Sequence, residues 1–158
     1  MQIFTVSLFG HREVSDLLAL EDRLAPLIGE LLKEQPYVSF LIGRSGEFDE
    51  FAASVIKRVR NALGRENSDL TLVLPYSVTN IEYYERYYDG IIIPESVTGV
   101  HPKAAIGKRN RWMVEQADLV VVCVERTVGG AYAAFKYART QKKSVINLGA
   151  PLDGGHSL

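Results

Sequence analysis

Cysteine is almost missing from the sequence, since Cys123 is the single one among 158 residues. One cysteine forms no internal disulfide and supplies no cysteine cluster for a structural zinc ion. Histidine is also scarce, and no two of the three histidines have the spacing of metal ligands, so we predict no metal and no other cofactor. A chain without disulfides is typical of a reducing compartment, and the predicted location is therefore cytoplasmic.

Long hydrophobic runs are missing as well. The longest unbroken apolar run covers residues 119–124, whereas a membrane-spanning helix needs about 20 mostly apolar residues. The first ten residues contain neither the basic segment nor the small-residue cleavage site of a signal peptide, and we interpret them as a strand. We therefore expect no membrane partner.

An excess of positive charge is the third thing that the sequence lacks. Its 18 basic and 19 acidic residues give a net charge of −1, which disfavours a general nucleic-acid binder. One stretch departs from this balance, because no acidic residue occurs between Glu95 and Glu115. The same stretch contains the basic residues His101, Lys103, Lys108, Arg109 and Arg111. Arginine has a planar fork that suits phosphate, so we predict that Arg109 contacts an anion and leave nucleic acid open as a partner.

What the sequence does contain is a regular alternation of apolar strands and amphipathic helices. The predicted strands cover residues 3–9, 38–42, 70–74, 91–93, 119–124 and 145–148. The predicted helices cover residues 15–34, 48–63, 81–88, 109–116 and 129–141, and Pro26 should kink or split the first of them. Alternation of this kind predicts an α/β fold with a doubly wound, mainly parallel sheet of the Rossmann-like type and helices on both faces. We expect one domain over residues 1–149 and a flexible tail over residues 150–158.

In a sheet of this kind the ligand lies beyond the carboxyl ends of the strands. Glycine-rich turns follow two of the predicted strands, and each opens a helix whose free N–H groups favour an anion. The candidate ligand-binding residues in the turns after the strands are Gly10, His11, Arg12, Gly43, Arg44, Ser45, Gly46, Glu47, Pro75, Gly129, Gly130 and Ala131.

Acidic residues crowd the beginning of the second predicted helix, where Glu47, Asp49 and Glu50 occupy the first turn. Carboxylates there stabilise the helix through its positive end, but they repel a phosphate placed close by. Two interpretations remain open. Either the acids contact sugar hydroxyls of a ligand, or they only complement the helix dipole.

Three strings of the sequence are similar to one known superfamily. They are FGHR (residues 9–12), GRSGEFDEFAA (43–53) and RNRWMVEQADLVVVCVERTVGGAYAAFKYA (109–138). Together they resemble the SLOG superfamily, a Rossmann-like group that includes the DNA-processing protein A family, the Lonely Guy phosphoribohydrolases and the YpsA-like proteins. The YpsA-like branch is the most similar, and the resemblance covers residues 4–148. It implies a nucleotide-binding sheet edge, with ligand-facing residues at Gly10, Arg12, Gly43, Ser45, Gly46, Arg109, Asn110, Gly129 and Gly130.

The enzymatic branch of this superfamily carries adjacent glutamates on the helix after the Gly-Gly turn, and this sequence has none there. Glu47 and Glu125 are the remaining candidates for a catalytic acid or base. We therefore expect a protein that binds a nucleotide or a nucleotide-derived small molecule resembling ADP-ribose, as a sensor, carrier or sequestering protein. The alternatives are a nucleotide N-glycosidase, which would be a phosphoribohydrolase-like hydrolase, and a single-stranded nucleic-acid binder. A homodimer is also left open.

Overall fold

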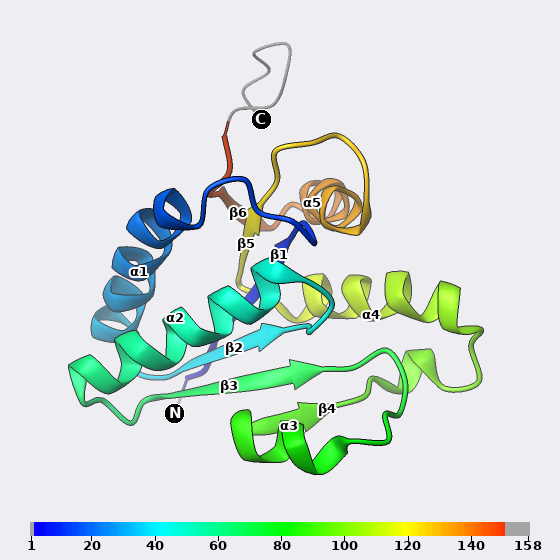
Figure 1. Cartoon of the computed structure of the whole chain (residues 1–158), viewed down its shortest axis with the longest axis horizontal. Coiled ribbons are helices and arrows are strands. Elements are labelled where there is room, and N and C mark those ends of the chain that lie inside the picture. Colours follow the sequence, from blue (N-terminus) through cyan, green and yellow to red (C-terminus); the bar gives the residue numbers. More distant parts are fainter. Residues whose placement is uncertain (1, 151–158) are drawn as a thin grey trace.

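The sheet of this protein has six strands, and it is built as the sequence predicts (Figure 1). A computed structural model describes residues 2–150 of the chain. The strands are β1 (Phe4–Gly10), β2 (Val38–Ile42), β3 (Ser68–Val73), β4 (Gly90–Ile92), β5 (Leu119–Cys123) and β6 (Ser144–Asn147). Their order is β4-β3-β2-β1-β5-β6, and every neighbouring pair is parallel. The parallel sheet is therefore confirmed, and the predicted strand ends lie within two residues of the observed ones.

Helices cover both faces of this sheet, which confirms the doubly wound architecture. They are α1 (Leu17–Glu34), α2 (Glu47–Leu63), α3 (Ile81–Tyr87), α4 (Pro102–Gln116) and α5 (Gly130–Thr140), with a short 3-10 turn at Glu95–Val97. Successive residues of β5 enter different hydrophobic cores, because successive side chains of a strand point to opposite faces. Val121 packs in the core that contains α1 and α2, whereas Val122 packs in the core that contains α4 and α5. Within residues 2–150, none of the helices combines the length and the apolar character needed to cross a membrane.

Two helices differ from the expectation. α1 is not split at Pro26 but continues through it to Glu34. Proline removes one helical hydrogen bond, and the carbonyl that loses its donor is that of Asp22. Pro26 and Asp22 are both exposed, so the missing bond lies on the solvated side of the helix, where water can supply the donor.

α4 begins at Pro102, well before the predicted span 109–116. Proline suits the first position of a helix, where its missing N–H is not needed. The side chain of His101 caps the helix, because its Nδ1 accepts a hydrogen bond from the backbone N–H of Lys103 at 3.2 Å. The stretch between Glu95 and Glu115 is therefore largely one helix, and its basic residues have fixed relative positions.

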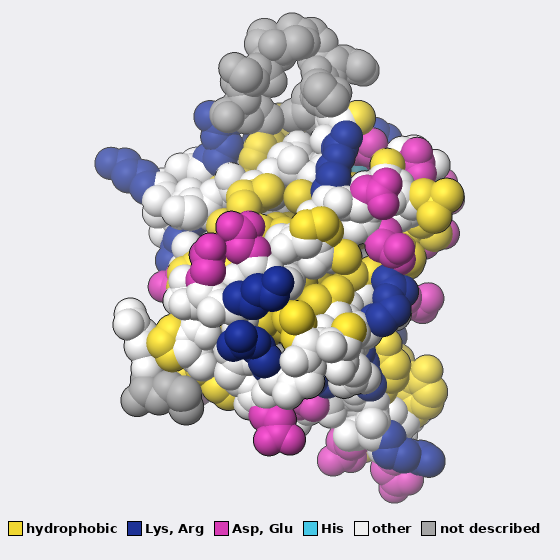
Figure 2. Space-filling view, turned by 90° about the vertical axis from the view of Figure 1, so that its left-hand side faces the viewer, with side chains coloured by type: hydrophobic (Ala, Val, Ile, Leu, Met, Phe, Trp, Pro, Cys, Tyr) yellow, Lys and Arg dark blue, Asp and Glu magenta, His cyan; other side chains and the backbone are white. Residues whose placement is uncertain are grey.

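The face that carries α1 and α2 has charges of both signs. Figure 2 shows lysine and arginine side chains interspersed there with aspartate and glutamate. One ion pair on this side joins Arg58 to Glu21. A mixture of this kind is ordinary for a solvated surface.

The predicted tail, residues 150–158, lies outside the described residues except for Ala150. At the end of β6, Leu148 is tied to the domain, since the Nη1 of Arg23 donates a hydrogen bond of 2.8 Å to its carbonyl oxygen. The single-domain boundary at residue 149 stays a prediction.

Candidate functional site

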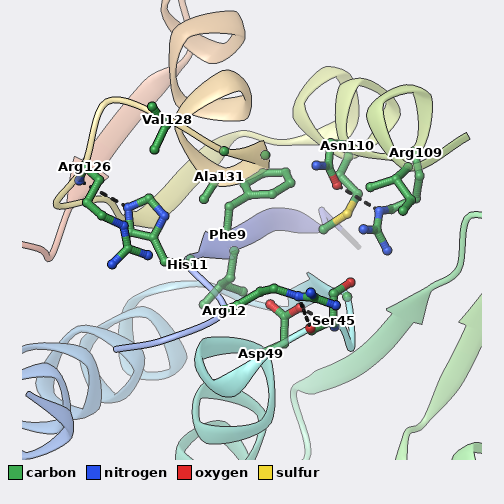
Figure 3. A pocket seen from close by; sticks show the side chains of 17 residues that line it. Phe9, His11, Arg12, Ser45, Asp49, Arg109, Asn110, Arg126, Val128 and Ala131 are labelled. Atoms are coloured by element: carbon green, nitrogen blue, oxygen red, sulfur yellow. Dashed lines mark hydrogen bonds between the residues drawn. The ribbon is translucent and has the colours of Figure 1, made fainter. Parts of the chain in front are cut away.

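A cavity of about 500 Å³ lies at the carboxyl edge of the sheet (Figure 3). The strand order reverses at this point, because β1 has β2 on one side and β5 on the other. Loops that leave β1 and β5 in opposite directions open a crevice between them. The cavity is lined by the end of β1, the beginnings of α2 and α5, and one side of α4. Phe9, Ile106, Met113 and Val128 provide apolar wall, whereas Arg12, Arg109 and Arg126 bring positive charge.

The beginning of α5 opens into this cavity with free backbone donors. Gly129 precedes the helix with a φ angle of 92°, a left-handed conformation that glycine adopts without strain. No side chain caps the helix, its first turn holds no acidic residue, and its first backbone bond runs from Ala133 N to Gly129 O. The N–H groups of Gly130 and Ala131 therefore have no helical acceptor, and both residues line the cavity. This arrangement favours an anion.

The beginning of α2 lies across the same cavity and has the opposite character. The carboxylate of Glu47 accepts a hydrogen bond from Val14 N at 2.7 Å, and that of Asp49 accepts one from Ser45 N at 2.9 Å. The backbone N–H of Glu47 is itself bonded to the carbonyl of Arg12. The first N–H group of this helix is therefore already bonded within the protein, and the acids of its first turn keep a phosphate away.

Arg109 lies on α4 with only 4% of its surface exposed, and it still lines the cavity. Its Nη1 donates to the carbonyl of Val73 at 2.9 Å. Its Nε donates to the side chain of Asn110 at 2.8 Å (Figure 3). Burial lowers the pKa of Arg109, and the nearby carboxylate of Asp49 opposes that change. The guanidinium remains charged because the pKa of arginine is far above neutrality. It is thus a fixed positive charge in the cavity wall.

Among the described residues, Asp49 is the only one with a carboxylate that lines the cavity. Gly43 lies between it and Arg109, since a Cβ at Gly43 would lie 3.0 Å from Nη1 of Arg109 and 3.2 Å from Oδ2 of Asp49. Burial raises the pKa of Asp49 from 3.8 to about 6, although the N–H of Ser45 and the charge of Arg109 favour the ionised form. The folded protein therefore holds this proton more tightly than the unfolded chain does.

This pKa difference predicts a pH-dependent stability. Ionisation of Asp49 lowers the free energy of unfolding as the pH rises from about 4 through about 6. Asp49→Asn removes that cost, so at neutral pH we expect its free energy of unfolding to exceed wild type by about 1–3 kcal/mol. Near pH 4 the two proteins should differ little. Chemical denaturation across this range measures the effect, with Glu50→Gln as an exposed control, and equal pH profiles for wild type and Asp49→Asn would contradict it.

His11 connects the end of β1 to the loop between β5 and α5. Its Nε2 accepts hydrogen bonds from the backbone N–H groups of Glu125 at 3.1 Å and Arg126 at 3.3 Å. A ring nitrogen that accepts is unprotonated, so the imidazole is neutral in this arrangement. Burial, followed by the positive charge of Arg126, lowers the pKa of His11 and keeps it neutral. His11 therefore holds in place the loop that leads into the beginning of α5 at the cavity.

Most of the residues predicted from the sequence line the cavity. Those that do are Gly10, His11, Arg12, Gly43, Ser45, Arg109, Asn110, Gly129, Gly130 and Ala131. Those that do not are Arg44, Gly46, Glu47 and Pro75. The guanidinium of Arg44 lies 5.4 Å from the ring centroid of Tyr84, outside the cavity lining.

Neither glutamate proposed from the sequence as a catalytic group lines the cavity. Glu125 accepts hydrogen bonds from the hydroxyl of Ser15 and from the backbone N–H of Ala150. Glu47 holds the N–H of Val14, as described above. Both carboxylates are therefore engaged in holding loops together.

Glu47 can be tested directly. Glu47→Gln keeps an oxygen for Val14 but removes the negative charge at the beginning of α2. We expect the free energy of unfolding to fall by about 0.3–1 kcal/mol, with no change in ligand affinity. Chemical denaturation and calorimetric titration of the same variant measure both quantities, and a weaker affinity without a stability change would instead indicate contact with the ligand.

Two charged residues that line the cavity, Arg126 and Asp49, are not among the candidate ligand-binding residues predicted from the sequence. Arg126 lies in the turn after the most apolar predicted strand, and a cation at the carboxyl end of a strand is the sequence feature that could have identified it. Asp49 was considered only as one of three acids in the first turn of its helix. The described residues contain no group of three or more histidine, cysteine or acidic side chains arranged to hold a metal ion.

Comparison of the structure with solved structures identifies the fold. DNA processing protein A from Streptococcus pneumoniae superposes with a TM-score of 0.65 and 15% sequence identity, over 90% of this chain and 49% of that one. This chain has the Rossmann-like fold of DNA processing protein A. The Rossmann-like fold that the resemblance noted in the sequence implies is thereby confirmed.

Two further structures share this fold. A DNA processing protein A from Helicobacter pylori, described for a unique single-stranded DNA binding mode, gives a TM-score of 0.60 and 15% identity over 90% of this chain and 63% of that one. A molybdenum cofactor binding protein from the phototrophic bacterium Rippkaea orientalis gives a TM-score of 0.62 and 20% identity over 95% and 78%. The chain thus spans about half to two thirds of the DNA processing proteins that it matches. No protein-family model and no curated protein sequence matches the chain.

Proposed function

We propose that this protein binds a nucleotide or a nucleotide-derived molecule resembling ADP-ribose in the cavity at the carboxyl edge of the sheet. In this role it acts as a sensor, carrier or sequestering protein. The observation that carries the proposal is the uncapped beginning of α5, where the N–H groups of Gly130 and Ala131 face a cavity lined by three arginines. A phosphate at this point receives backbone hydrogen bonds and positive charge together.

The other wall of the cavity suits the rest of such a molecule. Asp49 and the exposed Ser45 offer an acceptor and a hydroxyl to sugar hydroxyls, while Phe9 and Val128 offer apolar surface to a base. A cavity of about 500 Å³ falls within the range of small-molecule sites. Fold neighbours described as binding single-stranded DNA and a molybdenum cofactor support ligand binding in a general sense.

A hydrolytic role remains the second candidate because of one observation. Asp49 lines the cavity and has a pKa of about 6, which suits a group that gives and takes protons near neutral pH. Cleavage of an N-glycosidic bond in this cavity would use Asp49, because neither Glu47 nor Glu125 lines it.

The decisive experiment is recovery of the ligand from a cell extract. The purified protein is incubated with extract, washed, denatured, and the released small molecules are identified by mass spectrometry. Gly130→Val protein serves as the matched control, because its altered residue faces the cavity. We expect an intact nucleotide derivative with the wild type only, whereas free base and ribose phosphate would indicate hydrolysis. Failure to recover any phosphate-bearing molecule, together with failure to bind AMP or ADP-ribose in titration, would overturn the proposal.

A further inference from the structure

A second cavity, of about 670 Å³, lies between α4 and α5. We call it the α4–α5 groove. Its lining comes from residues spaced three or four apart on each helix, which places them on one helical face. On α4 these are Lys103, Ile106, Gly107, Asn110 and Arg111, and on α5 they include Gly130, Ala133, Lys136 and Tyr137. The function proposed above makes no use of this space.

The groove and the first cavity meet at the beginning of α5. Gly130, Asn110 and Ile106 line both of them. The free N–H groups at the beginning of α5 therefore lie where the first cavity and the α4–α5 groove meet. An anion held by these groups has open space on two sides.

The chemistry of the groove suits an anionic occupant. Lys103, Arg111 and Lys136 line it, and within the described residues no carboxylate does. Two of these cations are held over aromatic rings, since Arg111 lies 5.4 Å from the ring centroid of Tyr137 and Lys136 lies 4.9 Å from that of Tyr132. Charges that are already positioned lose less freedom when they bind.

The floor of the groove is apolar, and an acid outside its lining lies one turn of α4 beyond Arg111. Ile106 is 39% exposed although it is a large aliphatic residue, and Ala133 is also exposed on the facing helix. Beyond Arg111, the hydroxyl of Tyr137 donates a hydrogen bond to Glu115. An apolar strip between cations fits a nucleoside that bears phosphate, and Glu115 limits how far the negative charge extends.

We infer that the ligand of this protein is a dinucleotide, with its bridging phosphates at the beginning of α5, one nucleoside in the first cavity and the other in the α4–α5 groove. This inference rests on the function proposed above and names its ligand class. A mononucleotide ends at its phosphate and leaves the groove empty. A pyrophosphate or polyphosphate bridge has a nucleoside on each side, which matches an anion site placed between two cavities that each have the size of a small-molecule site.

The test compares AMP with diadenosine tetraphosphate by calorimetric titration. Gly107→Trp blocks the groove, and a Cβ at this exposed helical position meets no other atom within 4 Å. Tryptophan also has a higher helix propensity than glycine, so this variant should fold. We expect wild type to bind the dinucleotide at least about tenfold more tightly than AMP. In Gly107→Trp the dinucleotide affinity should fall to that of AMP, while AMP affinity stays within about twofold of wild type.

A second pair of variants tests the charge of the groove. Lys136→Glu should weaken dinucleotide binding about three- to tenfold at low salt and less at high salt. Lys108→Glu makes the same change in net charge, but Lys108 lines neither cavity, so its effect should be much smaller. Equal effects of the two variants would mean that net charge alone matters and would overturn the groove assignment.

The remaining outcomes separate this inference from the proposed function. If wild type binds AMP and the dinucleotide equally, or if Gly107→Trp leaves the difference unchanged, the dinucleotide assignment is wrong while nucleotide binding stands. If affinity for oligothymidylate rises with length beyond two nucleotides and falls steeply with salt, the occupant is single-stranded nucleic acid. If wild type binds none of these molecules, the proposed function and this inference both fail.

Discussion

Gly130→Val is expected to abolish nucleotide binding while the protein remains folded. A Cβ at Gly130 meets only Nδ2 of Asn110, at 3.7 Å, which is an ordinary contact. The branched side chain therefore disturbs the protein little, but it occupies the space beside the free N–H groups of α5. Each hydrogen bond to a charged group contributes about 1.5–3 kcal/mol, so the loss of two weakens affinity by at least about 100-fold.

Calorimetric titration with ADP-ribose, together with circular dichroism of the free protein, measures this effect. The matched control is Gly29→Val, since Gly29 lies on α1 away from the cavity and a Cβ there meets only a methyl group of Val59 at 3.8 Å. Wild-type affinity in a folded Gly130→Val protein would remove the beginning of α5 from the binding site.

Arg109→Ala should affect stability and affinity together. The side chain is buried, so its removal leaves the carbonyl of Val73 without a donor and Asp49 without its positive neighbour. Loss of one partner from a buried polar network lowers the free energy of unfolding by about 3 kcal/mol. Contact with a ligand phosphate adds a second effect, and we expect affinity, corrected for the folded fraction, to fall by roughly 10- to 150-fold.

Arg109→Lys keeps the charge without the planar fork and should restore only part of both quantities. Lys108→Ala, on the exposed side of the same helix, is the control. Melting temperatures with and without ligand separate the two effects, because a purely structural role lowers the melting temperature of the free protein and leaves the corrected affinity unchanged. That result would assign Arg109 to the scaffold alone.

The parts of the fold that the sequence predicts are those in which local pattern and burial agree. β5 is a continuous apolar run because both of its faces are covered, and both cores use it. The beginning of α4 was missed because Pro102 belongs to a stretch with loop-like composition, whereas its role depends on His101 accepting a hydrogen bond from Lys103. Such a cap depends on side-chain geometry, which periodicity does not report.

Sequence position alone predicts which loop reaches the cavity but not where each side chain points. Glu47, Asp49 and Glu50 share one helical turn, and successive residues of a helix point about 100° apart. Glu47 therefore reaches Val14, Asp49 enters the cavity, and Glu50 is exposed. The same limit applies to the arginines, because Arg12 lines the cavity while Arg44 lies near Tyr84.

The opposite characters of the two helix beginnings give the cavity an electrical direction. One end presents free donors and the other presents the carboxylate of Asp49, across a single space. A molecule with a negative end and a hydroxyl-rich or cationic end has one favourable placement, and turning it end for end brings like charges together. Charge alone therefore selects the orientation in which a ligand enters the cavity. A ligand of the same size with a negative charge at each end binds the first cavity less favourably than one with a single negative end.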